Sequence, residues 1–189
     1  MSRYRHIPNL ITGARLLLVP PLIALLWLEQ YTAAMVLFLV AGLSDGADGF
    51  LARRYGWTSR LGSLLDPLAD KLLHVGLYLS LGLLGHLPIW LVALVIGRDV
   101  LILAGAAAYR AALGNYRVEP RALSKFNTLM QMVLVLAVIV ALGGLPMPAG
   151  LIDALIYVVA ATTVASGSEY VWIWSGRARD RLRALRASR

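Results

Sequence analysis

Four aspartates in an otherwise apolar stretch, residues 45–70, are the side chains of this sequence best suited to metal chemistry. Asp45 and Asp48 are spaced i, i+3, and Asp66 and Asp70 are spaced i, i+4, so each pair shares one face of a helix. Two such helices facing each other would bring four carboxylates together. Close carboxylates in a poorly hydrated site either protonate or collect cations, and hard oxygen ligands select Mg²⁺, Mn²⁺ or Ca²⁺. The spacing therefore predicts a divalent-metal cluster.

Small residues and one arginine accompany the acids. Gly49, Ala52 and Gly62 allow two helix backbones, or a backbone and a bulky ligand, to approach closely. Arg53 can bind phosphate oxygens in fork geometry beside a bound metal. Together these residues predict a substrate that is a phosphate ester or anhydride. The alternative is that the acids are only interfacial helix ends, or that they pair with nearby arginines.

The composition is that of an integral membrane protein. Of 189 residues, 59% are hydrophobic and 15% are charged, and the mean hydropathy is +0.72, far from a soluble average. Cysteine is absent, which excludes disulfides and thiolate metal sites. The net charge of +8 could indicate nucleic acid binding in a soluble protein, but the basic residues here flank the apolar segments. They therefore predict membrane topology and no nucleic acid partner.

Six apolar segments approach the roughly 20 residues that a membrane-spanning helix needs. They cover residues 8–28, 32–54, 62–84, 88–110, 120–142 and 150–174. Basic residues gather before the first segment, in the 53–60 and 110–121 connections and after the sixth segment, whereas the other three connections contain no Lys or Arg. The positive-inside rule then places both termini in the cytoplasm. The acid-containing stretch is expected at the cytoplasmic face.

These observations predict an all-α integral membrane protein of the cytoplasmic or inner membrane, with six transmembrane helices and its site facing the cytoplasm. The membrane domain is expected to cover residues 1–176, and a basic cytoplasmic tail residues 177–189. Arginines in the tail alternate with Ala and Leu, which suits a short basic helix lying against anionic membrane lipids. The alternative is that these arginines act only as a positive-inside topology signal.

The central stretch matches, at every fixed position, the signature D-x-x-D-G-x-x-A-R, eight residues, G-x-x-x-D-x-x-x-D. By this match the chain is identified as a member of the CDP-alcohol phosphatidyltransferases. The resemblance implies a fold of six transmembrane helices, usually homodimeric. It also implies two Mg²⁺ or Mn²⁺ ions that hold the diphosphate of a CDP-linked lipid while an acceptor alcohol attacks the β-phosphorus and CMP leaves.

The resemblance assigns roles to individual residues. Asp45, Asp48 and Asp66 look like metal ligands, and Asp70 looks like a ligand that is also the general base. The residues that would form the nucleotide and diphosphate pocket are Asp45, Gly49, Ala52, Arg53 and Gly62. Lys71, His74 and Glu169 receive no role.

Two further regions are similar to members that make glycerol-based anionic phospholipids. Asn9, Thr12 and Arg15 fall within about a 120° arc at helical spacing, so they can face an acceptor cavity; a polar helix start with a snorkelling arginine is the alternative. Arg98-Asp99 and the segment 124–128, with Gln131, resemble the cardiolipin-making branch.

Arg98 and Lys125 are accordingly expected to bind the acceptor phosphate, and structural ion pairs with Asp99 or Glu119 are the alternative. Arg98 precedes Arg110 by 12 residues, roughly 18 Å along a helix, so it is expected deep in the membrane. Because adjacent helical residues do not face each other, Asp99 is not the expected partner of Arg98.

The favoured function is phosphatidyl transfer from CDP-diacylglycerol to phosphatidylglycerol, which makes cardiolipin and CMP. Glycerol 3-phosphate is the alternative acceptor and would give phosphatidylglycerophosphate. A cation transporter is a competing class, since intramembrane acids also mark ion pathways. Such acids would more naturally lie near the midplane on broken helices. An inactive family member acting as an assembly partner is a third, and the intact signature argues against it.

Overall fold

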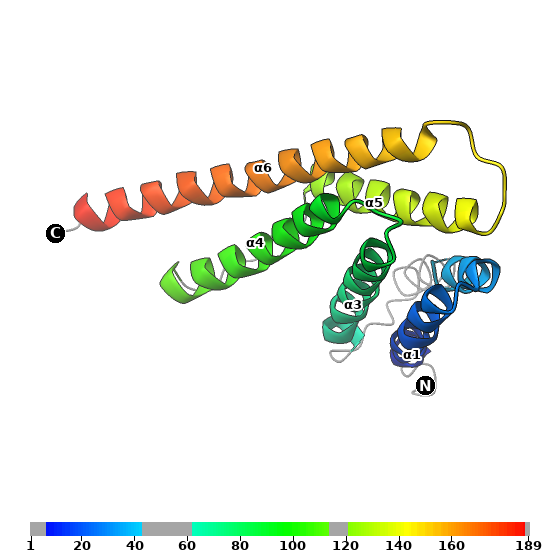
Figure 1. The fold of residues 1–189 in the computed structure, drawn as a ribbon. Coiled ribbons are helices and arrows are strands. Elements are labelled where there is room, and N and C mark those ends of the chain that lie inside the picture. The colour runs from blue at the N-terminus through cyan, green and yellow to red at the C-terminus, as the bar shows by residue number, and fades with distance from the viewer. Residues whose placement is uncertain (1–6, 43–61, 114–120, 188–189) are drawn as a thin grey trace. The chain divides into compact units, whose positions relative to one another are not determined.

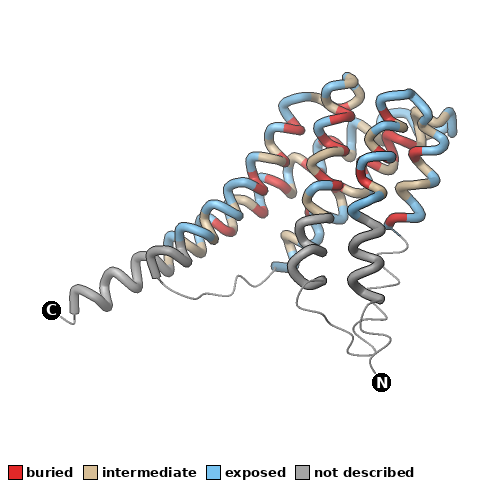
Figure 2. The backbone as a smooth tube through the Cα atoms, turned by 90° about the horizontal axis from the view of Figure 1, so that it is seen from below, coloured by how far each residue is buried: buried red, intermediate tan, exposed pale blue. Residues whose placement is uncertain are grey.

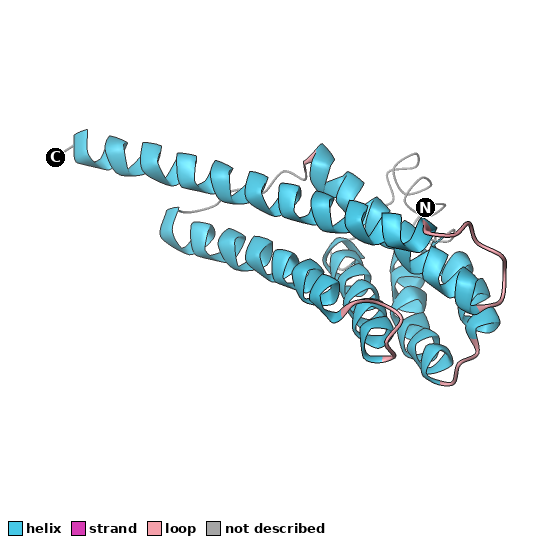
Figure 3. Cartoon of the chain, turned by 45° about the horizontal axis from the view of Figure 1, so that its top comes forward, coloured by secondary structure: helices cyan, strands magenta, loops and turns pink. Residues whose placement is uncertain are grey.

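The computed structural model describes residues 7–42, 62–113 and 121–187, and every regular element among them is a helix (Figures 1 and 3). The labelled helices are α1 (Ile7–Trp27), α3 (Gly62–Leu83), α4 (Ile89–Leu113), α5 (Ala122–Leu142) and α6 (Leu151–Ala187). A further helical segment covers Tyr31–Gly42. The all-α prediction is confirmed, and six helical segments fall in these ranges. The main difference is that α6 continues to Ala187 instead of ending near residue 174.

The described helices divide into two compact units. The first contains α1, Tyr31–Gly42, α3 and the part of α5 from Val135 onward. The second contains α4, the part of α5 up to Leu134, and α6. The described part of the signature, on α3, belongs to the first unit, whereas Arg98 and Lys125 belong to the second.

In the first unit, α1 packs against α3. Leu22 and Leu26 of α1 and Leu81 of α3 are fully buried. Gly76 permits the close approach, because a Cβ there would lie 2.7 Å from Ile23 Cδ1. Membrane helices gain little from water exclusion and associate through such small-residue packing. The signature helix α3 is therefore held by direct packing against α1.

Polar contacts join the end of α1 and the turn after it to the end of α3 and the turn after it. Trp27 Nε1 donates to Ser80 Oγ at 3.3 Å. Tyr31 and His86 hydrogen bond through Oη and Nε2 at 3.1 Å, with their rings edge to face. Gly85 occupies the left-handed region at φ +79° in the turn that follows α3, which a side chain would strain. These contacts tie the turn after α1 to the turn after α3.

In the second unit, α4 and α6 run parallel, and α5 runs antiparallel to α6. Arg98 contacts Ser166, and Gly105, further along α4, lies under the Trp174 ring. Along α5 the contacts with α6 run the other way, because Arg121, just before α5, meets Glu169, whereas Asn127, further along, meets Thr162 and Thr163. Figures 1 and 3 show α4 and α6 side by side.

Three of the described helices are long and apolar enough to cross a membrane: Ile89–Ala108, Ala122–Leu142 and Leu151–Gly176. Leu16–Trp27 and Tyr31–Gly42 are shorter apolar helical stretches. Exposed positions, pale blue in Figure 2, recur along the helices and include many large apolar side chains. Such a surface suits contact with lipid. The chain is an integral membrane protein in which α6, with 37 residues and about 55 Å of length, extends beyond its apolar span.

Candidate functional site

The second half of the signature lies on α3. Gly62 begins this helix, and Asp66 and Asp70 follow on it. The predicted i, i+4 pair therefore sits on a real helix, one turn apart and on one face. The signature residues that lie outside the described residues are Asp45, Asp48, Gly49, Ala52 and Arg53.

The face of α3 that carries Asp70 continues into the interior of the first unit. Asp70, His74 and Tyr78 follow each other at intervals of four residues, so they form one stripe along the helix. Asp70 is partly exposed, whereas His74 and Tyr78 are buried. The two rings lie 4.9 Å apart between centroids. Tyr78 thus limits the orientations open to the His74 ring, one turn below the proposed base.

The expected metal cluster stays a prediction. Within 7–42, 62–113 and 121–187, no three His, Asp or Glu side chains gather as a metal-binding group. Asp45 and Asp48 are not among these residues, and for Asp66 the structure describes only the helix backbone. The donor set itself suits the ions, since carboxylate oxygens one turn apart are ligands that Mg²⁺ and Mn²⁺ accept.

The three polar residues near the start of the chain lie on α1. Asn9, Thr12 and Arg15 occupy its first turns, and their spacing keeps them on one side of that helix. Their side chains lie outside the described residues, and the acceptor cavity stays a prediction. Since α1 packs against α3 within one unit, the three residues and the α3 acids do belong to neighbouring helices.

Arg98 is the centre of a buried polar cluster in the second unit. Its Nη1 donates to Asp99 Oδ1 at 2.8 Å, and its Nη2 donates to Ser124 Oγ at 2.5 Å and to Ser166 Oγ at 2.7 Å. The expectation that Asp99 would not be its partner is therefore wrong. Neighbouring Cβ atoms on a helix do diverge, but the long arginine side chain brings its guanidinium back to the adjacent carboxylate.

The contact with Ser124 gives the level of Arg98 relative to α5. Ser124 is the third residue of α5, so the Arg98 guanidinium lies level with the first turn of that helix. Along α4, Arg98 lies in the middle of the candidate span Ile89–Ala108. The expected depth of Arg98 in the membrane stays a prediction.

Asn127, from the segment 124–128, and Gln131 join α5 to α6. Asn127 Oδ1 accepts hydrogen bonds from Thr162 at 2.8 Å and Thr163 at 2.9 Å, and Gln131 Nε2 donates to Thr163 Oγ1 at 3.3 Å. Asn127 and Gln131 are almost completely buried. These side chains hold two helices together, whereas Lys125 is exposed and suits an anion contact better.

Near the same helix ends, Arg121 Nη1 pairs with Glu169 Oε1 at 3.2 Å. The Arg121 side chain is 46% exposed and the Glu169 side chain 28%, so this pair adds little to stability. Glu169, which received no role from the sequence, therefore joins α6 to the start of α5.

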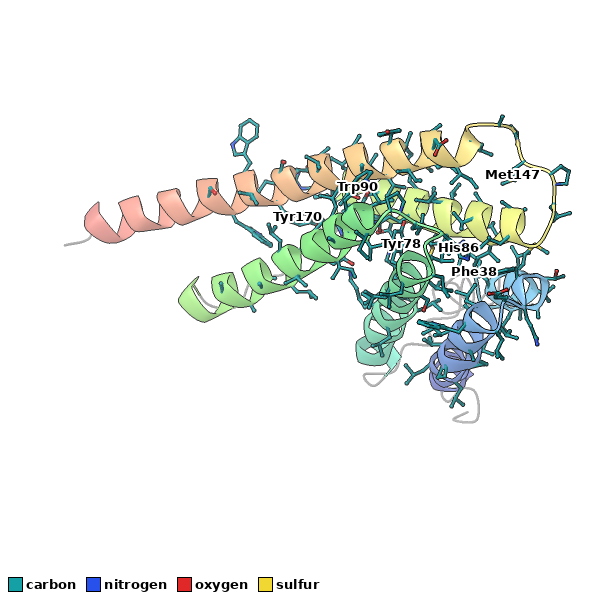
Figure 4. All side chains as sticks on the ribbon, viewed as in Figure 1. Phe38, Tyr78, His86, Trp90, Met147 and Tyr170 are labelled. Carbon is teal, nitrogen blue, oxygen red and sulfur yellow. The ribbon has the colours of Figure 1, made fainter. Side chains whose placement is uncertain are left out.

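A groove of about 570 Å³ lies between α4 and α6. Its lining residues are Ala93, Leu94, Gly97, Arg98, Leu101, Thr163, Val164, Gly167, Ser168, Val171 and Trp172. Tyr170, labelled in Figure 4, lies on the side of α6 toward α4 and packs with Trp174 at 5.6 Å between ring centroids. Sequence reasoning missed this groove and Ser166. Its glycines, Gly97 and Gly167, lie at similar levels of α4 and α6, which no local pattern in the sequence indicates.

Comparisons with known proteins agree on one family. The model of the CDP-alcohol phosphatidyltransferases matches residues 5–166. A cardiolipin synthase (CMP-forming) of Rattus norvegicus is 39% identical over 71% of this chain and 50% of its own length. A cardiolipin synthase / mitochondrial hydrolase fusion protein of Schizosaccharomyces pombe is 38% identical over 87% of this chain and 30% of its own length. A probable phosphatidylglycerophosphate synthase of Mycobacterium tuberculosis is 33% identical over 90% of this chain and 82% of its own length. The chain thus spans half or less of the two relatives named for cardiolipin synthesis.

Proposed function

The chain belongs to the CDP-alcohol phosphatidyltransferase family, and on that premise we propose that it transfers a phosphatidyl group from CDP-diacylglycerol to a glycerol-based acceptor and releases CMP. The observation that carries the proposal is the complete signature in residues 45–70, whose second half lies on the regular helix α3. A chain that had lost the activity would have no chemical reason to keep all four acids in an apolar stretch.

Asp70 is the proposed general base. The acceptor hydroxyl gives its proton to the Asp70 carboxylate while its oxygen bonds to the β-phosphorus, and the bond from that phosphorus to the CMP oxygen breaks. Gly49, Ala52 and Gly62 leave room for the cytidine and diphosphate, and Arg53 binds phosphate oxygens.

Asp45, Asp48, Asp66 and Asp70 would hold two Mg²⁺ or Mn²⁺ ions. When bound, these ions supply neutralisation of the charge that develops on the bridging and leaving oxygens. Of the four acids, Asp66 and Asp70 have the helical spacing for a shared site, since both lie on α3.

The proposed topology has six spans, with both termini and the site on the cytoplasmic side. It rests on the arginine distribution described above. This orientation allows CMP to leave into water while lipids enter sideways from the cytoplasmic leaflet. A homodimer is the assembly that the family resemblance implies.

Phosphatidylglycerol is the proposed acceptor. Relatives named for either acceptor match this chain at similar identities, so the support is the likeness of Arg98-Asp99 and the segment 124–128 to the cardiolipin-making branch. Arg98 and Lys125 are the proposed contacts to this lipid. Asp99 neutralises much of the charge of Arg98, so Lys125 provides the cation and Arg98 provides directed N–H donors. Asn9, Thr12 and Arg15 of α1 are proposed to line the acceptor cavity beside α3.

Glycerol 3-phosphate is the second candidate, because the probable phosphatidylglycerophosphate synthase of Mycobacterium tuberculosis matches this chain over most of both lengths. Purified full-length protein supplied with CDP-diacylglycerol, Mg²⁺ and one acceptor at a time separates the candidates by product mass. We expect cardiolipin and CMP from phosphatidylglycerol. Phosphatidylglycerophosphate from glycerol 3-phosphate alone would establish the alternative, and no CMP with any acceptor would overturn phosphatidyl transfer.

A further inference from the structure

Two prolines lie inside α1. Pro20 and Pro21 occupy the interior of this helix, and both are exposed. Proline has no amide hydrogen, so the carbonyl groups four residues earlier, those of Leu16 and Leu17, receive no helical hydrogen bond from it. In the apolar layer of a membrane, such carbonyls are tolerated where another group satisfies them or where they line a cavity. The prolines therefore place two backbone acceptors on α1.

The Leu16 carbonyl lies on the side of α1 that faces α3. Ile23 and Trp27, which contact α3, follow Leu16 by seven and eleven residues, that is by about two and three turns. A helix carbonyl points along the axis and stays on the side of its own residue, so the Leu16 carbonyl shares the side of these contacts. Leu17 lies about 100° further round the helix and is 76% exposed. Of the two carbonyls, that of Leu16 is the one that faces α3.

The contacts between α1 and α3 also give the level of this carbonyl. The two helices lie side by side (Figure 1), and the contacts made by Ile23 and Trp27 both join residues whose numbers differ by 53. The same offset places Leu16 opposite Ala69, the residue before Asp70. Alanine carries only a methyl group, so it leaves space beside the carbonyl. The Leu16 carbonyl is therefore level with the proposed general base.

Among the described side chains of the first unit, no hydrogen-bond donor lies on the facing sides of α1 and α3 near this level. Lys71 and His74 lie about 140° and 160° round α3 from Gly76, the residue that meets α1. The other helical stretches of the unit near this level are wholly apolar, namely residues 16–26, 33–42 and 135–142. The Leu16 carbonyl is thus available to a donor from a bound molecule.

The proposed acceptors share a hydroxyl that suits this carbonyl. In phosphatidylglycerol and in glycerol 3-phosphate, the primary hydroxyl that attacks phosphorus has a second hydroxyl on the adjacent carbon. When the attacking hydroxyl is at Asp70, its neighbour is close by. A neutral carbonyl oxygen accepts a hydrogen bond from a hydroxyl and offers nothing to a phosphate, which has only acceptor oxygens.

We propose that the Leu16 carbonyl accepts a hydrogen bond from the hydroxyl adjacent to the attacking one on the acceptor glycerol. This inference deepens the proposed function and rests on it. The contact selects an alcohol with two adjacent hydroxyls, whichever of the two acceptors is used, and it turns the attacking hydroxyl toward Asp70. Pro20 determines this specificity through the carbonyl that it leaves free.

The bond can be removed from either side, by taking the hydroxyl from the lipid or by returning an amide hydrogen to the helix. CMP release by the full-length protein is measured with phosphatidylglycerol and with phosphatidyl-1,3-propanediol, which keeps the primary hydroxyl and lacks the adjacent one. For the unmodified protein we expect kcat/KM to be roughly 2–10-fold higher with phosphatidylglycerol, as one neutral hydrogen bond gives. In Pro20→Ala the new N–H bonds to the Leu16 carbonyl, so the two lipids should react equally well. Glycerol 3-phosphate and 3-hydroxypropyl phosphate form the matching pair for the alternative acceptor.

Pro21→Ala is the matched control. It makes the same chemical change one residue later and satisfies the Leu17 carbonyl, on another side of α1, so the preference for the glycerol headgroup should remain. Both substitutions remove a proline from a helix interior, which favours the helix, and neither should lower the unfolding midpoint in detergent. A lost preference is then separated from unfolding. Equal loss of preference in both variants would assign the effect to the bend of α1 and overturn the carbonyl contact.

The contact and the proposed function can fail separately. Normal CMP release with the same preference in Pro20→Ala as in the unmodified protein would overturn the contact and leave phosphatidyl transfer standing. A raised KM for CDP-diacylglycerol in Pro20→Ala, with the acceptor preference unchanged, would assign the hydroxyl to the ribose of the donor and also overturn it. No CMP with any acceptor would overturn the function and the contact together.

Discussion

Arg98 carries a buried positive charge whose partners all lie within its own unit. Three side chains hold its guanidinium: Asp99, the next residue of α4, Ser124 of α5 and Ser166 of α6. Removing one partner of a buried charge leaves the others to compensate poorly. The position of Arg98 is therefore set by Ser124 and Ser166 as much as by Asp99.

Replacing these serines tests that view. Ser166→Ala removes a hydrogen bond to a charged donor, which is worth ~1.5–3 kcal/mol, and leaves the Arg98 charge in place. We expect a lower unfolding midpoint in detergent and a raised KM for the lipid acceptor, with kcat changed little. Ser175→Ala, on an exposed position of the same helix, serves as the control. An acceptor KM that stays at its original value would separate Arg98 from acceptor binding.

Asp70 combines two proposed roles that a single substitution can separate. Asp70→Asn keeps the size of the side chain but cannot accept a proton, so the rate should fall by the ~10²–10⁴-fold typical of a lost general base. Binding of CDP-diacylglycerol should survive, as measured by equilibrium binding to the variant. A variant that loses binding but keeps its turnover at saturation would remove the base assignment.

The metal proposal predicts a different pattern for the other acids. CMP release should stop in EDTA and return with added Mg²⁺ or Mn²⁺. The reason is that no residue of the signature can neutralise a diphosphate as fully as two divalent ions can. Asp45→Asn, Asp48→Asn and Asp66→Asn should each lower turnover by orders of magnitude. Full activity in EDTA would exclude the metal mechanism.

At the scale of helices, the lengths of apolar segments predicted most of the fold, because a bilayer demands helices of about 20 residues. The observed α1, α3 and α5 begin and end within a few residues of the expected segments. A short basic helix was one of the two interpretations of the tail 177–189, but its continuity with α6 was not predicted, although Ala, Leu and Arg in its last turns favour a helix. The apolar span of α6 ends at Gly176, whereas residues with high helix propensity continue to Ala187.

The contacts between helices were less accessible to sequence. Spacing rules describe where a Cβ points, so they missed that the long Arg98 side chain reaches Asp99. The segment 124–128 was correctly singled out, yet Asn127 within it joins α5 to α6. The groove depends on two glycines from segments 70 residues apart, 97 and 167, and no local pattern relates them.

Gly105 shows how closely α4 and α6 pack, and it gives a test at this scale. A Cβ there would overlap the Trp174 ring, whose movement is limited by Tyr170. An alanine in a helix normally gains up to ~1 kcal/mol over glycine, but overpacking of this kind costs ~1–3 kcal/mol. We expect Gly105→Ala to lower the unfolding midpoint.

The same substitution in a Trp174→Ala background provides the control, because the overlap is then removed. There we expect Gly105→Ala to be neutral or stabilising. If Gly105→Ala lowers stability equally in both backgrounds, α4 and α6 do not pack through this contact.

At the scale of the whole chain, the site requires one orientation in the membrane. The donor nucleotide and CMP are soluble, so the aspartates of residues 45–70 must be open to the side on which CDP-diacylglycerol presents its headgroup. The arginine-rich connections predict that this side is the cytoplasm. Three of the helices, α4, α5 and α6, are long and apolar enough to span a membrane. Two of them, α5 and α6, lie between the 110–121 connection and the C-terminal tail, so both of these segments are expected on the same side of the membrane.

The absence of cysteine makes this orientation directly measurable, because a single introduced thiol has no background. Cysteines at Asn115 and Ala178 should react with a membrane-impermeant maleimide only in inside-out vesicles, and cysteines at Gln30 and Ala149 only in right-side-out vesicles. The expectation follows because one span separates Asn115 from Ala149, and another separates Ala149 from Ala178. Each variant should keep its rate of CMP release, which establishes that the labelled protein is folded. If Asn115 and Ala149 reacted from the same side, α5 would not cross the membrane, and the proposed topology of six spans would be wrong.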